Sequence, residues 1–366
     1  MWKTELHESI RTISELKSLG YIGETEYEAL TGIAEQFPIM IPNYYLSLID
    51  KSDPNDPIKK MCVPSAMELN MAGSFDTSGE ADNTVIQGLQ HKYKNTALIL
   101  STNICAMYCR HCFRKRLVGL SEVETMCMMD DIVEYIGLHD EIDNVLISGG
   151  DALLNSNRVL EHILAALSEM EHLKFIRIGT RIPVVLPSRI TDDDELRDIL
   201  SACSAKKPLY IVTQFNHPRE LTAQASLAVK QLNECGIIVN NQTVLLHGVN
   251  DNIPTLAKLL NKLTSSGVIP YYVFQCRPVA AVKTQFQVPF LTAIDIVEGA
   301  KAKVNGIAKR FKYVMSHPSG KIEIIGKIRG SKMVFKYHQP KYDEDIGRLF
   351  AVNVTADQCW LDEQLA

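Results

Sequence analysis

Short apolar runs alternate with longer amphipathic stretches between about residues 96 and 276. The apolar runs are rich in β-branched residues and cover residues 97–100, 145–147, 175–178, 210–212, 237–239 and 271–274. The stretches between them repeat apolar residues at helical spacing, over residues 128–138, 158–170, 194–202, 223–235 and 253–265. Strands that alternate with helices predict a parallel sheet built of βαβ units. Six units fall short of the eight of a closed barrel, so the pattern predicts a partial (β/α)6 TIM-like barrel over residues 91–305.

The two ends of the chain follow other patterns. Apolar positions recur at helical spacing around residues 10–19 and 25–33, and a Pro- and Asp-rich stretch follows at 50–57. This predicts a helical N-terminal segment, residues 1–90, that contains a loop. Three short apolar runs after residue 305, separated by Gly and Pro, predict a short antiparallel C-terminal extension over residues 306–366. The predicted fold class is α/β.

Composition narrows the classes of partner. The formal net charge is −5, with 46% hydrophobic and 22% charged residues. These values are typical of a globular protein and give no positive field for nucleic acid. No apolar stretch reaches the length of about 18 residues that a membrane span needs. The first residues mix charges and resemble no signal peptide, so we expect a cytoplasmic protein without nucleic-acid or membrane partners.

Three of the nine cysteines fall within eight residues, at Cys105, Cys109 and Cys112. An odd number of cysteines in a long chain without an export signal argues against a disulfide framework. Closely spaced thiolates are typical of iron–sulfur ligation, and three ligands on a [4Fe–4S] cube leave one iron open to a small molecule. The alternatives are three packing cysteines, or a zinc site with His111 as its fourth ligand.

Polar or glycine-rich groups follow each predicted strand. Gly149 and Gly150 follow the second strand and would let a backbone approach a ligand closely, with Asp151 as a polar group or simply a helix N-cap. The later strands end at Arg181, Gln214, Gln242 and Arg277. Chemistry in such folds gathers at the carboxyl ends of the strands. The pattern therefore predicts a ring of functional groups around one cavity.

The Cys-x3-Cys-x2-Cys motif after the first strand resembles the signature of the radical S-adenosylmethionine (radical SAM) superfamily. That resemblance implies that the open iron binds the methionine moiety and that cleavage gives a 5′-deoxyadenosyl radical. It also implies that Tyr108 contacts adenine and that residues 149–151 hold the methionine ammonium. A reductant such as flavodoxin or ferredoxin is then an expected partner.

Longer strings resemble one family within this superfamily, lysine 2,3-aminomutase. The similar strings lie within residues 5–326, at 42–50, 53–57, 109–112, 148–154, 181–187, 215–218, 241–251 and 271–276. The resemblance implies pyridoxal 5′-phosphate (PLP) as a further cofactor and migration of an amino group from the α to the β carbon of an amino acid. Lys321, directly after Gly320, matches the place of the PLP lysine. The alternative for Lys321 is an exposed turn lysine.

The same resemblance implies roles for further cations. Arg114 matches the clamp for the substrate α-carboxylate, a task that suits a guanidinium, although it could also be a solvated loop charge. Lys92 and Gln242 correspond to positions near the PLP phosphate or the substrate. At Lys92 the family usually carries arginine.

Three departures from the family concern the substrate and the assembly. Lysine-specific members bind the substrate ammonium with two aspartates, where this chain has Arg277 and Ser316. Arg277 would repel lysine and suits an acidic side chain, so we expect a non-lysine, possibly acidic, amino acid. Of the family's C-terminal cysteine cluster, this chain has only Cys359. We therefore expect no structural zinc, and a homo-oligomer stays an open alternative. The alternatives are a family member that acts on lysine or protein-bound lysine, and a non-catalytic iron–sulfur redox sensor.

Overall fold

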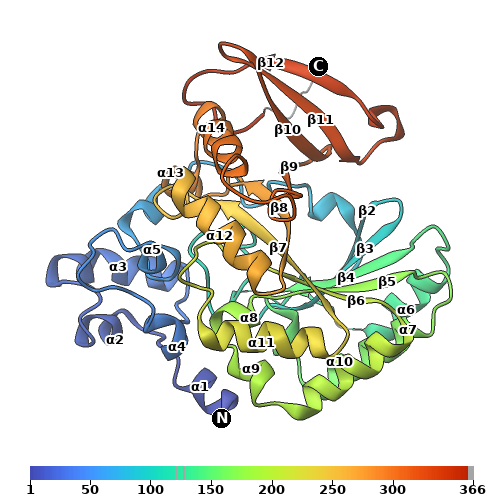
Figure 1. Ribbon diagram of the computed structural model, residues 1–366. Helices are drawn as coiled ribbons and strands as arrows, with labels where there is room; N and C mark the ends of the chain where they lie inside the picture. Colours follow the sequence, from blue (N-terminus) through green and yellow to red (C-terminus); the bar gives the residue numbers. More distant parts are fainter. Residues whose placement is uncertain (121, 127, 362–366) are drawn as a thin grey trace.

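The computed structural model describes residues 1–120, 122–126 and 128–361, and its strands form one open sheet (Figure 1). The sheet has 12 strands, each paired with the next along the chain, from β1 (Thr84–Ile86) at one edge to β12 (Leu349–Asn353) at the other. Helices and strands alternate through the middle of the chain. The predicted α/β class is therefore confirmed.

Six consecutive strands run parallel, as the hydrophobic pattern predicts. They are β3 (Thr96–Thr102), β4 (Asn144–Gly149), β5 (Phe175–Gly179), β6 (Leu209–Thr213), β7 (Ile238–Leu245) and β8 (Ile269–Gln275). The main helices after them are α6 (Met129–Gly137), α7 (Asn157–Ser168), α10 (Asp194–Lys206), α11 (Ala223–Glu234), α12 (Ile253–Ser265) and α14 (Phe290–Lys301). All six predicted strands and five predicted helices are present, and α14 is an addition.

The core forms where the apolar stripe of each helix meets the sheet. In α7, Leu160, Ile163, Leu164 and Leu167 are buried at helical spacing, as an amphipathic helix requires. In Figure 1, α10 and α11 lie along the outside of the parallel strands, together with the short helices α8 (Ile182–Val185) and α9 (Ser188–Thr191). No helix in the described ranges is long and apolar enough to cross a membrane.

The N-terminal segment is helical, as predicted, but it also contributes two strands. Its helices are α1 (Trp2–His7), α2 (Ile13–Ser18), α3 (Glu24–Gln36), α4 (Asn43–Leu46) and α5 (Pro57–Cys62), followed by the 3-10 turns η1 (Ala66–Leu69) and η2 (Ala81–Asn83). The loop at 50–57 ends at Asp56, whose carboxylate accepts the N–H of Lys59 and caps α5. β1 and β2 (Leu89–Tyr93) were not predicted because β1 has only three residues and β2 is largely polar. The predicted boundary at residue 90 lies inside β2.

The C-terminal extension continues the main sheet. β9 (Lys312–His317), β10 (Gly320–Arg329) and β11 (Lys332–Pro340) pair in antiparallel fashion, as predicted, and β12 adds a fourth antiparallel strand that was not predicted. β9, however, runs parallel to β8. The extension therefore joins the sheet as its seventh parallel strand and the hairpins that follow, which lie at the top of Figure 1.

Candidate active site

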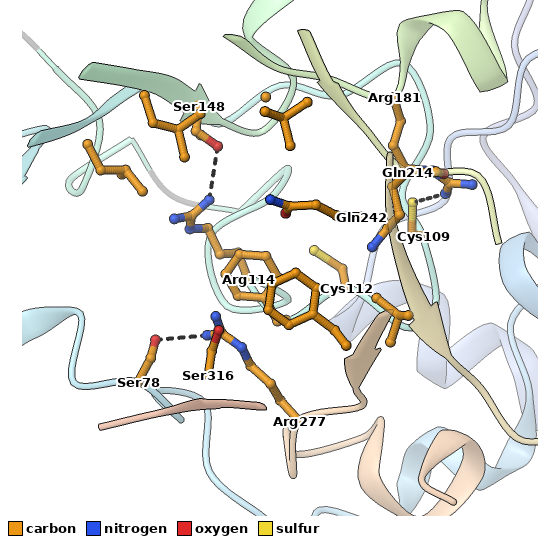
Figure 2. Close-up of a pocket in the computed structure, with 18 of the residues that line it drawn as sticks. Ser78, Cys109, Cys112, Arg114, Ser148, Arg181, Gln214, Gln242, Arg277 and Ser316 are labelled. Carbon is orange, nitrogen blue, oxygen red and sulfur yellow. Dashed lines mark hydrogen bonds between the residues drawn. The ribbon is translucent and has the colours of Figure 1, made fainter. Parts of the chain in front are cut away.

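A cavity of about 350 Å³ opens at the carboxyl ends of the parallel strands. It brings together residues predicted from widely separated parts of the chain. These are Lys92, Cys105, Cys109, Cys112, Arg114, Gly149, Gly150, Asp151, Arg181, Gln214, Gln242, Arg277 and Lys321. The predicted ring of groups at the strand ends is therefore present, and Figure 2 shows part of it.

Tyr108 is the predicted site residue that lies outside this cavity. It lines a small adjoining recess together with Phe37, Pro38 and Lys115. Its backbone N–H donates to Met40 O at 3.0 Å, which ties the cysteine loop to the N-terminal segment. The structure thus places Tyr108 beside the cysteines but on another side from the other predicted residues.

The three clustered cysteines lie close together in dry surroundings. Burial raises the pKa of Cys105, and burial and Cys109 raise the pKa of Cys112 to about 11. A cationic donor, Arg181 Nη1, lies 2.6 Å from Cys109 Sγ. Buried thiols become thiolates only when a cation compensates them, and iron does so. The three residues therefore fit a [4Fe–4S] cluster. Cys127 lies outside the described residues.

His111 has partners other than the cysteines. Its Nε2 accepts a hydrogen bond from Asn216 Nδ2 at 3.2 Å and lies 3.4 Å from Gln214 Oε1. Burial lowers the pKa of His111 to about 3, so the ring is neutral. No three His, Cys, Asp or Glu side chains in the described part of the chain are placed to share a single metal ion. A [4Fe–4S] cluster does not require three side chains to share one ion, because each cysteine would bind a different iron.

Gly149 and Gly150 allow β4 to end against the cysteine loop. A Cβ on Gly149 would lie 2.3 Å from Thr102 O, and one on Gly150 would lie 2.3 Å from Ile104 O. The close approach that we expected is therefore to the protein's own backbone. Asp151 is both an N-cap and a buried polar group, because it accepts from Leu153 N at 3.2 Å and from Arg181 N at 2.7 Å. Burial raises its pKa to about 6.

Lys321 lies on β10, across the cavity from the cysteines. Its Nζ is 4.6 Å from the centre of the Tyr272 ring and 3.5 Å from Gln339 Oε1. Burial and the neighbouring cations Arg177 and Arg277 lower the pKa of Lys321 to about 7. An amine with a pKa near 7 has a substantial neutral fraction at neutral pH and is suited to bond with a carbonyl carbon, so Lys321 fits the PLP lysine.

Four cations of the cavity wall have no carboxylate within the ion-pair limit of 4.0 Å in the described ranges: Lys92, Arg177, Arg277 and Lys321. Lys92 Nζ donates to two carbonyls, Ser78 O at 3.1 Å and His317 O at 2.8 Å, and burial and Arg277 lower its pKa to about 7. Arg177 Nε is buried and has no hydrogen-bond partner within the described part of the chain. Such groups are costly to bury, so this wall is suited to anionic ligands.

Arg114 and Arg277 both lie against the ring of Phe113. Their guanidinium carbons are 4.6 and 4.2 Å from the ring centre. Arg114 donates to Glu80 Oε1 through Nε at 3.0 Å and to Ser148 Oγ at 3.2 Å, whereas Arg277 donates to Ser78 Oγ at 2.8 Å (Figure 2). Two guanidiniums held apart in one cavity can bind two carboxylates.

Sequence reasoning missed several members of this site. Ser78 and Glu80 precede the first strand in an irregular segment, and no pattern places them in the cavity. Glu220 follows β6 and pairs with Arg181 at 2.8 Å. For Arg177 a signal exists, because a charged residue interrupts the apolar run of β5.

The fold and the cysteine loop define a radical SAM enzyme. Residues 99–260 match the family model described as the radical SAM superfamily. This class carries a [4Fe–4S] cluster and uses S-adenosylmethionine. The predicted cluster and its small-molecule ligand are therefore confirmed at the level of the class.

Relatives with similar sequences narrow the class. A protein of Aquifex aeolicus named "Putative L-lysine 2,3-aminomutase" is 41% identical over 97% of this chain and 95% of its own length. The L-lysine 2,3-aminomutase of Clostridium subterminale is 38% identical over 87% of this chain and 76% of its own. The glutamate 2,3-aminomutase of Clostridioides difficile is 34% identical over 87% and 74%. The chain belongs to the lysine 2,3-aminomutase family.

Family membership confirms that the chain is an isomerase, a radical SAM aminomutase, and that PLP is its further cofactor. It excludes the alternative of a non-catalytic redox sensor. An amino acid substrate is consistent with it. The names of the relatives include both lysine and glutamate, so the comparisons do not identify the substrate. The residues of the cavity have to be considered for that.

Proposed function

We propose that this enzyme moves the α-amino group of an acidic amino acid, glutamate or aspartate, to the β carbon. The observation that carries the proposal is Arg277. Its guanidinium lines the cavity, and among the described residues its hydrogen-bond partner is the uncharged Ser78 Oγ at 2.8 Å. Glu80 is close enough to influence it electrostatically but is bonded to Arg114 and Arg116.

The charge of the cavity wall supports an acidic substrate. Lys92, Arg177, Arg277 and Lys321 lack carboxylate partners in the ranges that the structure describes. The phosphate of PLP and the substrate α-carboxylate would compensate part of this charge. A lysine ammonium would add a further cation, whereas a side-chain carboxylate would pair with Arg277.

Within this proposal, the residues on the two sides of the cavity have different tasks. Cys105, Cys109 and Cys112 hold the cluster. The cluster and S-adenosylmethionine, when bound, supply the radical that starts the migration. Gly149, Gly150, Asp151, Arg181 and Gln214 would surround S-adenosylmethionine in the cavity, and Tyr108 would contact it from the adjoining recess beside the cysteines. Lys321 holds PLP, with Lys92 and Gln242 near its phosphate or the substrate, and Arg114 orients the substrate α-carboxylate through its own fixed position on Glu80.

The organisation of the chain enters the proposal as well. We take residues 1–90 as the helical segment, 91–305 as a partial (β/α)6 barrel and 306–366 as the extension that carries Lys321. The helices on the outside of the parallel strands and the cavity at their carboxyl ends support the partial barrel. We also propose a one-electron donor of the flavodoxin or ferredoxin type, and a homo-oligomer as a further possibility to test.

A substrate screen tests the function. The protein, loaded with cluster and PLP, is incubated anaerobically with S-adenosylmethionine, dithionite and L-glutamate, L-aspartate or L-lysine in separate reactions. We expect a new β-amino acid, together with 5′-deoxyadenosine, from an acidic substrate. A β-isomer from L-lysine alone would contradict the proposal.

L-lysine is the second candidate substrate. The names of two of the relatives above support it, one of them at 41% identity. Against it stands Arg277, which would have to lie beside the ammonium of the substrate. The same screen separates the two candidates in one measurement.

A further inference from the structure

A buried chain of hydrogen bonds leads from the N-terminal segment to one of the cluster cysteines. Arg181 uses each arm of its guanidinium for a different partner. Nη1 lies 2.6 Å from Cys109 Sγ, Nη2 donates to Glu220 Oε1 at 2.8 Å, and Nε donates to Gln214 O at 3.1 Å. This three-way arrangement needs the planar fork of an arginine, which a lysine does not have.

Glu220 is itself held from several directions. Its side chain is fully buried, and its carboxylate accepts hydrogen bonds from Tyr45 Oη at 2.7 Å, Asn216 N at 2.6 Å and His217 N at 2.9 Å besides Arg181. Tyr45 belongs to α4, so the N-terminal segment contributes one of the donors that hold Glu220. A carboxylate that accepts four hydrogen bonds is fixed in place, and it holds the guanidinium of Arg181 in position.

We propose that Arg181 sets the reduction potential of the [4Fe–4S] cluster through Cys109, with Glu220 and Tyr45 as the residues that position it. Reduction adds one negative charge to the cluster. A cation that donates a hydrogen bond to a cysteine ligand stabilises the reduced form and so raises the potential. Glu220 offsets part of this positive charge, and its presence keeps the increase moderate.

The two charges of the pair then act in opposite directions, which makes the proposal testable. Replacing Arg181 with glutamine removes the cation and leaves the carboxylate of Glu220, so the potential should fall. Glu220→Gln removes the anion and leaves Arg181, so the potential should rise. We expect each variant to change the reduced-to-oxidised ratio at a fixed potential by about tenfold, equivalent to about 59 mV for one electron.

The measurement is a dithionite titration of the reconstituted cluster followed by electron paramagnetic resonance. S-adenosylmethionine, PLP and amino acid are left out, so the readout depends neither on activity nor on the substrate. Iron content is determined for each variant to confirm that the cluster is complete. The result is therefore independent of the proposed substrate.

Two controls complete the experiment. The double variant Arg181→Gln, Glu220→Gln removes both charges and should shift the potential less than Arg181→Gln does; it also keeps the test possible if a single variant does not fold. Arg219→Gln removes the cation next to Glu220 in sequence, which pairs with Asp56 and donates to no cysteine among the residues that the structure describes, and it should leave the potential unchanged. An unchanged potential in Arg181→Gln, or shifts of the same sign in both single variants, would overturn the proposal.

Discussion

The cysteine side and the lysine side of the cavity differ in how their charges are balanced. On the cysteine side, Arg181 pairs with Glu220, and Arg110 and Lys115 both pair with Glu68 in fully buried ion pairs. On the lysine side, Lys92, Arg177, Arg277 and Lys321 line the wall without a carboxylate partner in the described residues. The cysteine side is electrostatically complete by itself, whereas the lysine side becomes complete only when anionic ligands bind.

The N-terminal segment explains much of this difference. It supplies Glu68 and Tyr45 to the cysteine side, and Arg110 donates from its backbone to Met61 O at 2.9 Å and from Nη1 to Pro38 O at 3.1 Å. The lysine side is built instead from β2, β5, β10 and the segment after β8, which carry Lys92, Arg177, Lys321 and Arg277. A rigid site for a permanent cluster and a cationic site for exchanging ligands thus share one cavity.

The largest effect is expected when Lys321 on the lysine side is replaced. In Lys321→Ala the absorbance of protein-bound PLP should disappear, and turnover should fall on the order of a thousandfold or more, because no other group can replace the lysine amine. Spectra of the PLP-treated protein and turnover measurements check this. Lys327→Ala, an exposed position on the same strand, should retain both. Normal PLP binding in Lys321→Ala would assign the cofactor to another residue.

The next largest effect is a loss of stability when Glu68 on the cysteine side is replaced. Although burial opposes it, Arg110 and Lys115 hold the pKa of Glu68 below its usual value. Glu68→Gln leaves two buried cations without their anion and should lower the free energy of unfolding by about 3–5 kcal/mol, a factor of several hundred in the folding equilibrium. Anaerobic urea unfolding measures this.

The matched control for Glu68 is an exposed pair. Lys206 and Glu169 form an ion pair at 2.5 Å with side chains 59% and 69% exposed. Glu169→Gln should leave the free energy of unfolding almost unchanged, because solvent screens the pair. An equal loss in the free energy of unfolding for Glu68→Gln and Glu169→Gln would show that the buried pairs of the cysteine side are no stronger than a surface pair.

A charge reversal sharpens the comparison at the substrate. Arg277→Asp should reduce kcat/KM for an acidic amino acid by about a hundredfold, since it removes one partner of a buried charge pair and adds repulsion. The same variant should gain turnover of L-lysine. Arg329→Asp, exposed on β10, serves as the control and should change neither. Unchanged selectivity in Arg277→Asp would place the side chain of the substrate elsewhere.

The smallest effect concerns pH. Since burial and two arginines lower the pKa of Lys321 to about 7, its neutral amine predominates above that pH and is protonated below it. The rate of PLP incorporation into the cofactor-free protein should fall about tenfold per unit below pH 7 and level off above it. Stopped-flow absorbance from about pH 5.5 to about pH 11 measures the midpoint.

Two variants assign that midpoint. Arg177→Gln removes one of the cations that depress the pKa of Lys321 and should move the midpoint to higher pH. Lys92→Arg replaces a second lysine of low pKa with a side chain that stays charged, and should leave the midpoint in place. A midpoint near 10.5, the ordinary lysine value, would show that the amine is not shielded from water.

The parallel part of the fold could be predicted because its signal is local. Helix α12 has the predicted bounds, residues 253–265, since its apolar periodicity begins directly after the capping residue Asn252. β7 was predicted three residues long but continues to Leu245, because polar inward residues such as Asn241 interrupt its apolar run. The parallel pairing of β9 with β8 depends on contacts between distant segments, which no local pattern contains.

The candidate site shows the same limit. Residues at the ends of strands, such as Arg181 and Arg277, could be placed in one cavity because parallel strands end at one edge. Ser78 and Glu80 could not, since they reach the cavity through an irregular turn in which the Asp76 carboxylate accepts three backbone N–H groups, from Ser78, Glu80 and Ala81. Their role becomes visible only when the turn is seen beside Arg114.

The continuity of the sheet from β3 to β10 has one further consequence. The cysteine loop follows β3 and Lys321 lies on β10, so both are carried by the same hydrogen-bonded ladder. Their separation is set by the number and curvature of the strands between them. The connections that enter the strands from the other edge, such as residues 169–174 and 266–268, can change in length without altering it. Evolution can therefore vary the periphery of this enzyme while the span between radical source and amine stays constant.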